Sequence, residues 1–381
     1  MGRDLDWKLL AIAIILSIIG LMSIYSATHY RGSAMFDSSG DLFNISSSLW
    51  FKQLIWLLIS LVVAVFMANF NYQRFWDLAW FLYVTSLVLL ILVLLIGEEK
   101  SGAKRWLDFG QFSVQPAELA KISIIILLAR YFSKLMSYQF SDSAYRSRAY
   151  VISKTVLVPI LIVFIPVLLI IKQPDLGSSI VLLPILLIIL FCAHIPLKLF
   201  SGLIVLGAGV MPFLWHFLKP YQQRRLLVFL NPNMDPLGAG YTITQSKIAI
   251  GSGQVLGKGW LAGSQNQLNF LPERHTDFIF SIIAEEWGFL GSLAIMCLYF
   301  LLIWRIIEII SKTNDLFGRL ICVGLVAFLS FQILVNIAMT SGIMPVVGLP
   351  LPFVSYGGSS LLLSFFCIGI ALNISKQHIS F

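Results

Sequence analysis

The sequence predicts an all-α, polytopic integral membrane protein with about ten transmembrane helices. Of its 381 residues, 58% are hydrophobic and only 12% are charged, whereas a typical soluble domain has roughly 25% charged residues. The apolar residues also form blocks about as long as the roughly 20 residues that a helix needs to cross a bilayer. Because lipid cannot satisfy backbone polar groups, we expect each block to be a helix.

The first apolar block follows Lys8 and is too long for the apolar part of a signal peptide, so we expect it to be the first span. The fifth and sixth blocks are short. All four cysteines fall inside blocks, which predicts core residues rather than disulfides. The expected spans are residues 9–27, 54–70, 77–97, 117–134, 155–171, 178–194, 197–217, 278–304, 320–340 and 357–375.

The distribution of positive charge predicts the orientation. With both termini in the cytoplasm, the cytoplasmic side receives thirteen Lys and Arg residues and the short outer loops receive six, as the positive-inside rule requires. The net charge of +8 does not indicate nucleic acid binding, because there is no basic arm and no repeat of aromatic and basic residues. The expected outer segments are 28–53, 98–116, 172–177, 218–276 and 341–356.

We expect a single domain over residues 1–381 with one long, structured outer loop at about 218–276. A loop of this length in a compact protein is usually functional. It contains many turn-forming residues, with a short amphipathic helix expected over 242–250. Its glycines at 251–259 do not match a phosphate-binding loop and predict a turn. The prolines of 341–356 exclude a regular helix there.

Asp277 stands where this long loop meets an apolar block. Ionisable groups at the edge of a bilayer are costly and are often functional. The residue is either a cap of the following helix or a general base or ligand. On a helix it would share one face with Ser281 and Glu285, which follow at spacings of four.

Other charged residues admit two interpretations each. Glu118 and Lys121 are one helical turn apart, so they form either a buried salt bridge or the wall of a water-accessible cavity. Arg105 and Arg225 either bind phosphate or anchor the chain at headgroup level. Asp175 lies in a tight outer turn, where a capping role is commoner than a catalytic one.

Several stretches of this sequence, which contain the residues named above, resemble the SEDS family of bacterial cell-wall proteins (shape, elongation, division and sporulation). They occur in family order over nearly the whole chain, and they are closer to the elongation member than to the division member. The matching stretches are Lys104–Asp108, Gln115–Lys121, Gln173–Ser178, Tyr221–Pro232, Leu271–Gly291 and Asn336–Ser360.

The resemblance implies a peptidoglycan glycosyltransferase of the bacterial cytoplasmic (inner) membrane, acting at its outer face during cell elongation. It would invert the sugar linkage while polymerising lipid II, a disaccharide-pentapeptide on undecaprenyl diphosphate, into a growing glycan strand. A class B penicillin-binding protein, the transpeptidase, would be its partner. The alternatives are a lipid II flippase and a non-catalytic scaffold of the elongation complex.

The resemblance also implies roles for single residues. Asp277 matches the essential aspartate of the family, Glu118 and Lys121 match the pair that lines its central cavity, and Arg105 matches an important outer-loop arginine. The leaving diphosphate would be stabilised by Arg105, Lys121 and Arg225, or by a divalent cation, Mg or Mn, since no cofactor is otherwise indicated. Asp175 and Ser355 are further expected substrate-binding residues.

Overall fold

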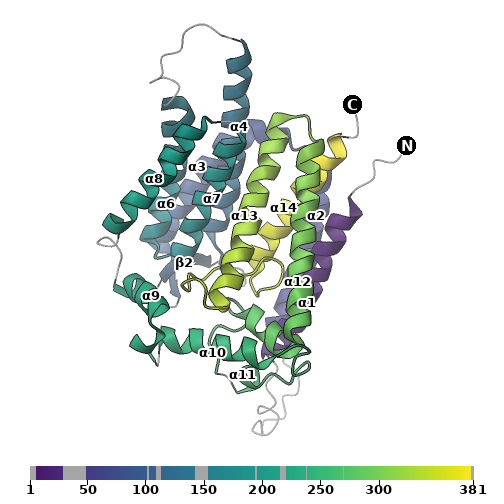
Figure 1. Ribbon diagram of the computed structural model, residues 1–381. Coiled ribbons are helices and arrows are strands. Elements are labelled where there is room, and N and C mark those ends of the chain that lie inside the picture. The colour runs from purple at the N-terminus through teal and green to yellow at the C-terminus, as the bar shows by residue number, and fades with distance from the viewer. Residues whose placement is uncertain are drawn as a thin grey trace.

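The computed structural model describes residues 6–28, 49–100, 103–108, 113–141, 153–193, 195–214, 220–236, 238–268 and 270–378. Within these residues, a long helix occupies each of the ten expected spans (Figure 1). They are α1 (Trp7–Thr28), α2 (Leu49–Asn69), α3 (Arg74–Ile96), α4 (Pro116–Ser141), α6 (Val158–Lys172), α7 (Leu176–Cys192), α8 (Leu197–Leu214), α12 (Ile279–Lys312), α13 (Leu316–Thr340) and α14 (Gly358–His378).

In the described part of the chain, seven segments are long and apolar enough to cross a membrane. One of them is α6 together with the π-helical turn η3 (Ser153–Leu157) that precedes it. The helix α7, expected to be short, has 17 residues. The four cysteines lie in α7, α12, α13 and α14 and are free. Cys322 and Cys367 are buried, as expected for core residues, whereas Cys297 is exposed, so the prediction of a core position is wrong for Cys297.

The helix α13 lies in the middle of the bundle. In the most apolar 18-residue window of α13, 72% of the window is buried, whereas 28% of the corresponding window is buried in both α2 and α3. It packs on α4, α7 and α12. The exposed residues of α2 and α3 are mostly large and apolar, which is what contact with lipid requires.

One expected outer loop contains a small sheet that the sequence did not predict. The strands β1 (Glu98–Lys100), β2 (Ala103–Asp108) and β3 (Ser113–Val114) pair antiparallel in the order β1-β2-β3. Glu99 pairs with Lys104 and Leu107 pairs with Val114, and the register of β1 with β2 shifts between Glu98 and Glu99. The sheet gives Arg105 a fixed backbone, so this arginine does not sit on an irregular loop.

The long loop folds over the end of the bundle that is opposite the two termini (Figure 1). Its elements are α9 (Pro220–Leu230), the 3-10 turn η5 (Pro232–Met234), α10 (Ala239–Ser252) and α11 (Ser264–Gln267). The helix expected at 242–250 is confirmed by α10. The turn expected at 251–259 is confirmed after Ser252, and it packs against α12.

The turn contacts α12 where the helix is interrupted at Gly288. Gly288 has a φ of 66° and a ψ of −161° inside α12, a conformation that is essentially restricted to glycine. The backbone N–H groups that follow the break donate to the turn, with Phe289 N 2.8 Å from the carbonyl of Gln254. In return, Lys258 N donates to the carbonyl of Glu285 at 3.0 Å.

Candidate active site

Asp277 lies in a run of turns, residues 271–278, directly before α12. The backbone N–H groups of Thr276 and Asp277 both donate to the carbonyl of Glu273, each at 3.2 Å. The helix begins at Ile279, its N-cap residue is Phe278, and its first turn contains no acidic residue. The interpretation of Asp277 as a helix cap is therefore wrong. No hydrogen bond or ion pair of its carboxylate is found among the described residues.

Two side chains from distant segments fix this turn. Asn336 Nδ2, on α13, donates to the carbonyl of Asp277 at 3.0 Å and to that of Leu349 at 2.7 Å. Ser355 Oγ donates to the carbonyl of Thr276 at 2.6 Å. The hydroxyl of Ser355, an expected substrate-binding residue, is thus engaged with the backbone next to Asp277.

The polar face expected for Asp277, Ser281 and Glu285 does not form, because Asp277 precedes the helix. Ser281 Oγ lies 2.7 Å from Ser246 Oγ of α10. Glu285 Oε1 accepts a hydrogen bond from Lys258 Nζ at 2.8 Å. Ser281 and Glu285 therefore hold the long loop onto α12, and both are fully buried.

Burial and neighbouring charge set the proton affinity of Asp277. Its side chain keeps partial contact with solvent, yet its pKa is raised from 3.8 to about 6, chiefly because the surrounding protein desolvates the carboxylate. The carboxylates of Glu273 and Asp175 contribute to this rise, while Arg225 and Arg105 oppose it. Asp277 thus titrates near neutral pH, where a general base is most effective.

Arg105 and Asp175 meet beside the start of α7. Arg105 Nη2 donates to the carbonyl of Pro174. Asp175 is the N-cap residue of α7 and accepts from Ser178 N at 3.1 Å, so its capping role is confirmed. It also accepts from Gln115 Nε2 at 2.9 Å. Because both charges act on Asp277, this junction forms one side of its surroundings.

Arg225 approaches from α9, on the long loop. Its Nη1 donates to the carbonyl of Val346 at 3.4 Å, and its charge is the largest favourable influence on the ionised form of Asp277. The adjacent Arg224 instead pairs with Asp235 at 3.1 Å. Arg105 and Arg225 therefore bring positive charge to one carboxylate from two separate elements.

The expected pair of Glu118 and Lys121 exists. Lys121 Nζ lies 2.6 Å from Glu118 Oε1, and the two residues are 0% and 4% exposed. Lys121 Nζ also lies 5.3 Å from the ring centroid of Phe328 on α13. The second oxygen, Glu118 Oε2, has no hydrogen-bond partner among the described residues. A buried carboxylate oxygen without a partner is costly, which favours water or a ligand beside it.

Sequence reasoning missed three polar residues of this region. Glu273 acts on Asp277, and Asn336 and Gln332 lie on α13 at spacings of four from Phe328. Both amide atoms of Gln332, and Asn336 Oδ1, are buried without a partner within the described ranges. A glutamine and an asparagine in the middle of an apolar span are expensive, and that signal was present in the sequence.

Among the described residues, no group of three or more His, Cys, Asp or Glu side chains could hold a metal ion. The positive charges that act on Asp277 are those of Arg225 and Arg105.

Comparison with known proteins gives consistent results. Residues 6–379 match the model of the FtsW/RodA/SpoVE family, described as cell cycle proteins. The chain is 43% identical over 321 residues to the peptidoglycan glycosyltransferase MrdB of Escherichia coli K12, covering 84% of each chain. It is 32% identical to the peptidoglycan glycosyltransferase RodA of Treponema pallidum, covering 99% of this chain and 98% of that one.

Solved structures agree with these relatives. A chain from work described as "Structural coordination of polymerization and crosslinking by a peptidoglycan synthase complex" superposes with a TM-score of 0.79 at 31% identity, with 98% of each chain covered. The crystal structure of the rod shape determining protein RodA of Thermus thermophilus superposes with a TM-score of 0.70 at 27% identity, again with 98% of each chain covered.

Proposed function

The chain belongs to the FtsW/RodA/SpoVE family, and from this premise we propose that it polymerises lipid II into the glycan strands of peptidoglycan during cell elongation. It is a glycosyltransferase and a multi-pass protein of the bacterial inner membrane, like the relatives named above. The polymerised substrate, the side of the membrane and the residue roles below are our proposals.

One observation supports the proposed site. The carboxylate of Asp277 has a pKa of about 6, and the positive charges of Arg105 and Arg225 act on it. Glycosyl transfer from a diphosphate needs a base for the attacking hydroxyl and positive charge for the leaving group. The surroundings of Asp277 contain both. A purely structural ion pair would instead place a guanidinium in direct contact with the carboxylate.

The reaction follows from these roles. A sugar hydroxyl of the acceptor attacks the anomeric carbon of the donor, on the face opposite the diphosphate. Its proton passes to Asp277 as the new glycosidic C–O bond forms. The bond between the anomeric carbon and the diphosphate oxygen breaks, and the lipid diphosphate leaves with the electron pair. Because the attack is in line, the configuration inverts.

Three cations would hold the diphosphates of the two lipid substrates. Arg105 and Arg225 flank Asp277, and a planar guanidinium can bind two phosphate oxygens at once. Lys121 is buried beside Glu118, so its charge is not screened by solvent. Asp175 acts through Gln115 and the start of α7, and we propose that it positions this side of the site.

We propose that the site faces outward and that a class B penicillin-binding protein is the partner. The thirteen Lys and Arg residues that the sequence assigns to the side of the two termini favour a cytoplasmic location for that side. The long loop lies at the end opposite the termini (Figure 1), and Asp277 follows this loop directly, just before α12 begins at Ile279. A related chain comes from a complex that couples polymerisation with crosslinking.

We further propose that helices and loop form one domain, since α10 packs on α12 and α13.

The test is polymerisation of labelled lipid II by the purified protein with its cognate transpeptidase partner. Wild type should yield glycan strands, and the Asp277→Asn variant, shown to be folded and to retain the partner, should yield none. Equal product from both would refute the role of Asp277. Absence of product from wild type, together with lipid II crossing vesicle membranes in its presence, would instead favour the flippase.

A further inference from the structure

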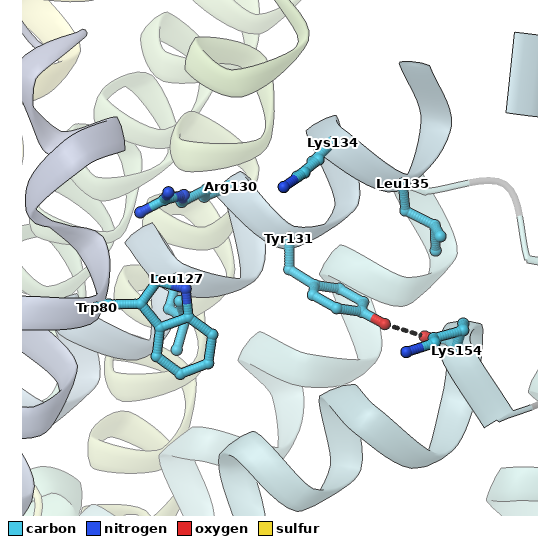
Figure 2. A pocket seen from close by; sticks show the side chains of 7 residues that line it. All are labelled: Trp80, Leu127, Arg130, Tyr131, Lys134, Leu135 and Lys154. Atoms are coloured by element: carbon cyan, nitrogen blue, oxygen red, sulfur yellow. Dashed lines mark hydrogen bonds between the residues drawn. The ribbon is translucent and has the colours of Figure 1, made fainter. Parts of the chain in front are cut away.

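A second charged site lies at the other end of the bundle, near the termini. A cavity of about 300 Å³ opens between α3, α4 and the start of the α6 segment. Figure 2 shows its lining: Trp80, Leu127, Arg130, Tyr131, Lys134, Leu135 and Lys154. Three of these residues are cations and none is a carboxylate. The cavity therefore suits an anion.

Two contacts hold the arrangement of the cavity. Tyr131 Oη donates to the backbone carbonyl of Lys154 at 2.6 Å, which ties the start of the α6 segment to α4 (Figure 2). The Arg130 guanidinium lies 5.6 Å from the ring centroid of Trp76. Within the described residues, no carboxylate pairs with Arg130 or Lys154.

Exposed apolar side chains lead away from the cavity along two of its helices. On α3, Trp80 and Val84 are 50% and 52% exposed, and on the α6 segment Leu157 and Leu161 are each 59% exposed. Exposed apolar residues on spanning helices face lipid chains. Tryptophan and tyrosine prefer the headgroup level of a bilayer. The cavity therefore lies at the boundary between headgroups and acyl chains.

We propose that this cavity binds one anionic phospholipid from the leaflet at this end of the bundle. Arg130, Lys134 and Lys154 hold its phosphate, and its acyl chains lie along Val84 and Leu161. Basic pockets between transmembrane helices bind anionic headgroups in this way. The apolar surface beside the cavity selects a phospholipid over free phosphate, which has no chains to bury. The lipid is a structural ligand, distinct from the substrates of Asp277.

The first test compares lipid retention by native mass spectrometry. The protein is exchanged into mixtures of phosphatidylglycerol and phosphatidylcholine with identical chains. The variant Arg130→Gln/Lys134→Gln/Lys154→Gln is compared with a control of equal charge at the same end, Lys8→Gln/Lys198→Gln/Lys376→Gln. Wild type and control should retain phosphatidylglycerol with about tenfold preference, and the cavity variant should retain neither lipid selectively.

Other outcomes would overturn the proposal. No preference in wild type, or equal losses in the cavity variant and the control, would show that only general surface charge acts. If the triple variant does not fold, the single variants Arg130→Gln and Lys154→Gln are expected to weaken retention by about fivefold each, and unchanged retention in both would also contradict it.

The second test separates a lipid from a free phosphate. Excess inorganic phosphate or glycerol 3-phosphate should leave bound phosphatidylglycerol in place, because neither can occupy the apolar face next to the cavity. Displacement of the lipid by either would refute binding of the acyl chains. The readout needs no enzymatic activity, so it is independent of the proposed function of Asp277.

Discussion

Asn336 Nδ2 lies 3.0 Å from the backbone carbonyl of Asp277, across 59 residues of sequence. The same amide donates to the carbonyl of Leu349 at 2.7 Å. One fully buried side chain of the central helix thus joins the turn that carries the proposed base to the last outer loop. The position of the carboxylate depends on α13 as well as on its own turn.

The first prediction concerns this positioning. In Asn336→Ala, the carbonyls of Asp277 and Leu349 lose their donor, so we expect the turn to relax and kcat for glycan polymerisation to fall at least tenfold, with a smaller effect on KM. The control is Asn373→Ala on α14, which removes a buried hydrogen bond of 2.9 Å to the carbonyl of Ala68 at the opposite end. Both variants should lose similar thermal stability. Equal loss of kcat in the two would show that Asn336 only supports the fold.

The second prediction is the pH dependence of the reaction. A pKa of about 6 for Asp277 means that the base is protonated in acid, so we expect kcat at pH 5 to be about a tenth of its plateau above pH 7. For stability the sign is opposite. Between the ordinary value of 3.8 and about 6, the folded protein binds more protons than the unfolded chain, so this group lowers stability as pH rises.

It follows that Asp277→Asn should unfold at a temperature no lower than wild type at pH 7, although it is inactive. Thermal unfolding followed by tryptophan fluorescence at pH 5 and pH 7 would measure this. A variant that unfolds well below wild type at pH 7 would contradict the desolvated state of the carboxylate.

The third prediction uses the neighbouring charges. Arg225 lowers the pKa of Asp277 and Glu273 raises it. We therefore expect the acid limb of the rate profile to move to higher pH in Arg225→Gln and to lower pH in Glu273→Gln. Arg224→Gln is the matched control, because Arg224 pairs with Asp235. Identical profiles in all three variants would mean that another group controls the limb.

The fourth prediction separates the two interpretations of the buried pair. Lys121→Met leaves the Glu118 carboxylate buried and unpaired, which should cost about 3–5 kcal/mol of stability. Adding Glu118→Gln should recover most of that stability. If Lys121 binds a substrate diphosphate, as we propose, the double variant stays inactive despite its stability. Recovery of polymerisation in the double variant would show that the pair serves only helix packing.

The ten helices could be predicted because the length of an apolar run is local information. The small sheet could not, since β2 is six residues long and carries Lys104, Arg105 and Asp108 without an alternating pattern. Its pairing partners are equally short. The helix at 242–250 was visible because an amphipathic pattern is also local information. The start of α12 was expected at residue 278, one residue before the observed Ile279.

The site was predictable in its residue types and not in its contacts. Asp277, Arg105, Arg225 and Asp175 were expected residues, and their charges do act on one another. These residues come together from a strand, a helix of the long loop and two turns. Their spacing within one element does not show that these elements meet. Asn336 was recognisable as a polar residue within an apolar span, but its contact with Asp277 was not, because that partner lies 59 residues away.

The fifth prediction concerns the break in α12. A Cβ at Gly288 would lie 2.3 Å from Gly257 N and 2.6 Å from the carbonyl oxygen of Val255. In addition, the backbone of Gly288 occupies a region that costs other residues about 1–3 kcal/mol. Gly288→Ala should therefore release the turn at 253–259 from α12, and limited proteolysis should cut the long loop faster than in wild type.

Gly251→Ala is the matched control, because a Cβ at Gly251 meets no atom within 4 Å. Gly251 lies in α10, where alanine is favoured over glycine by about 0.5–1 kcal/mol. The long loop of the Gly251→Ala variant should resist the protease as well as that of wild type. Because α10 also reaches α12 through the 2.7 Å contact between Ser246 and Ser281, release of the turn should slow polymerisation only partly. Cleavage at the same rate in both variants would show that the break in α12 does not hold the loop.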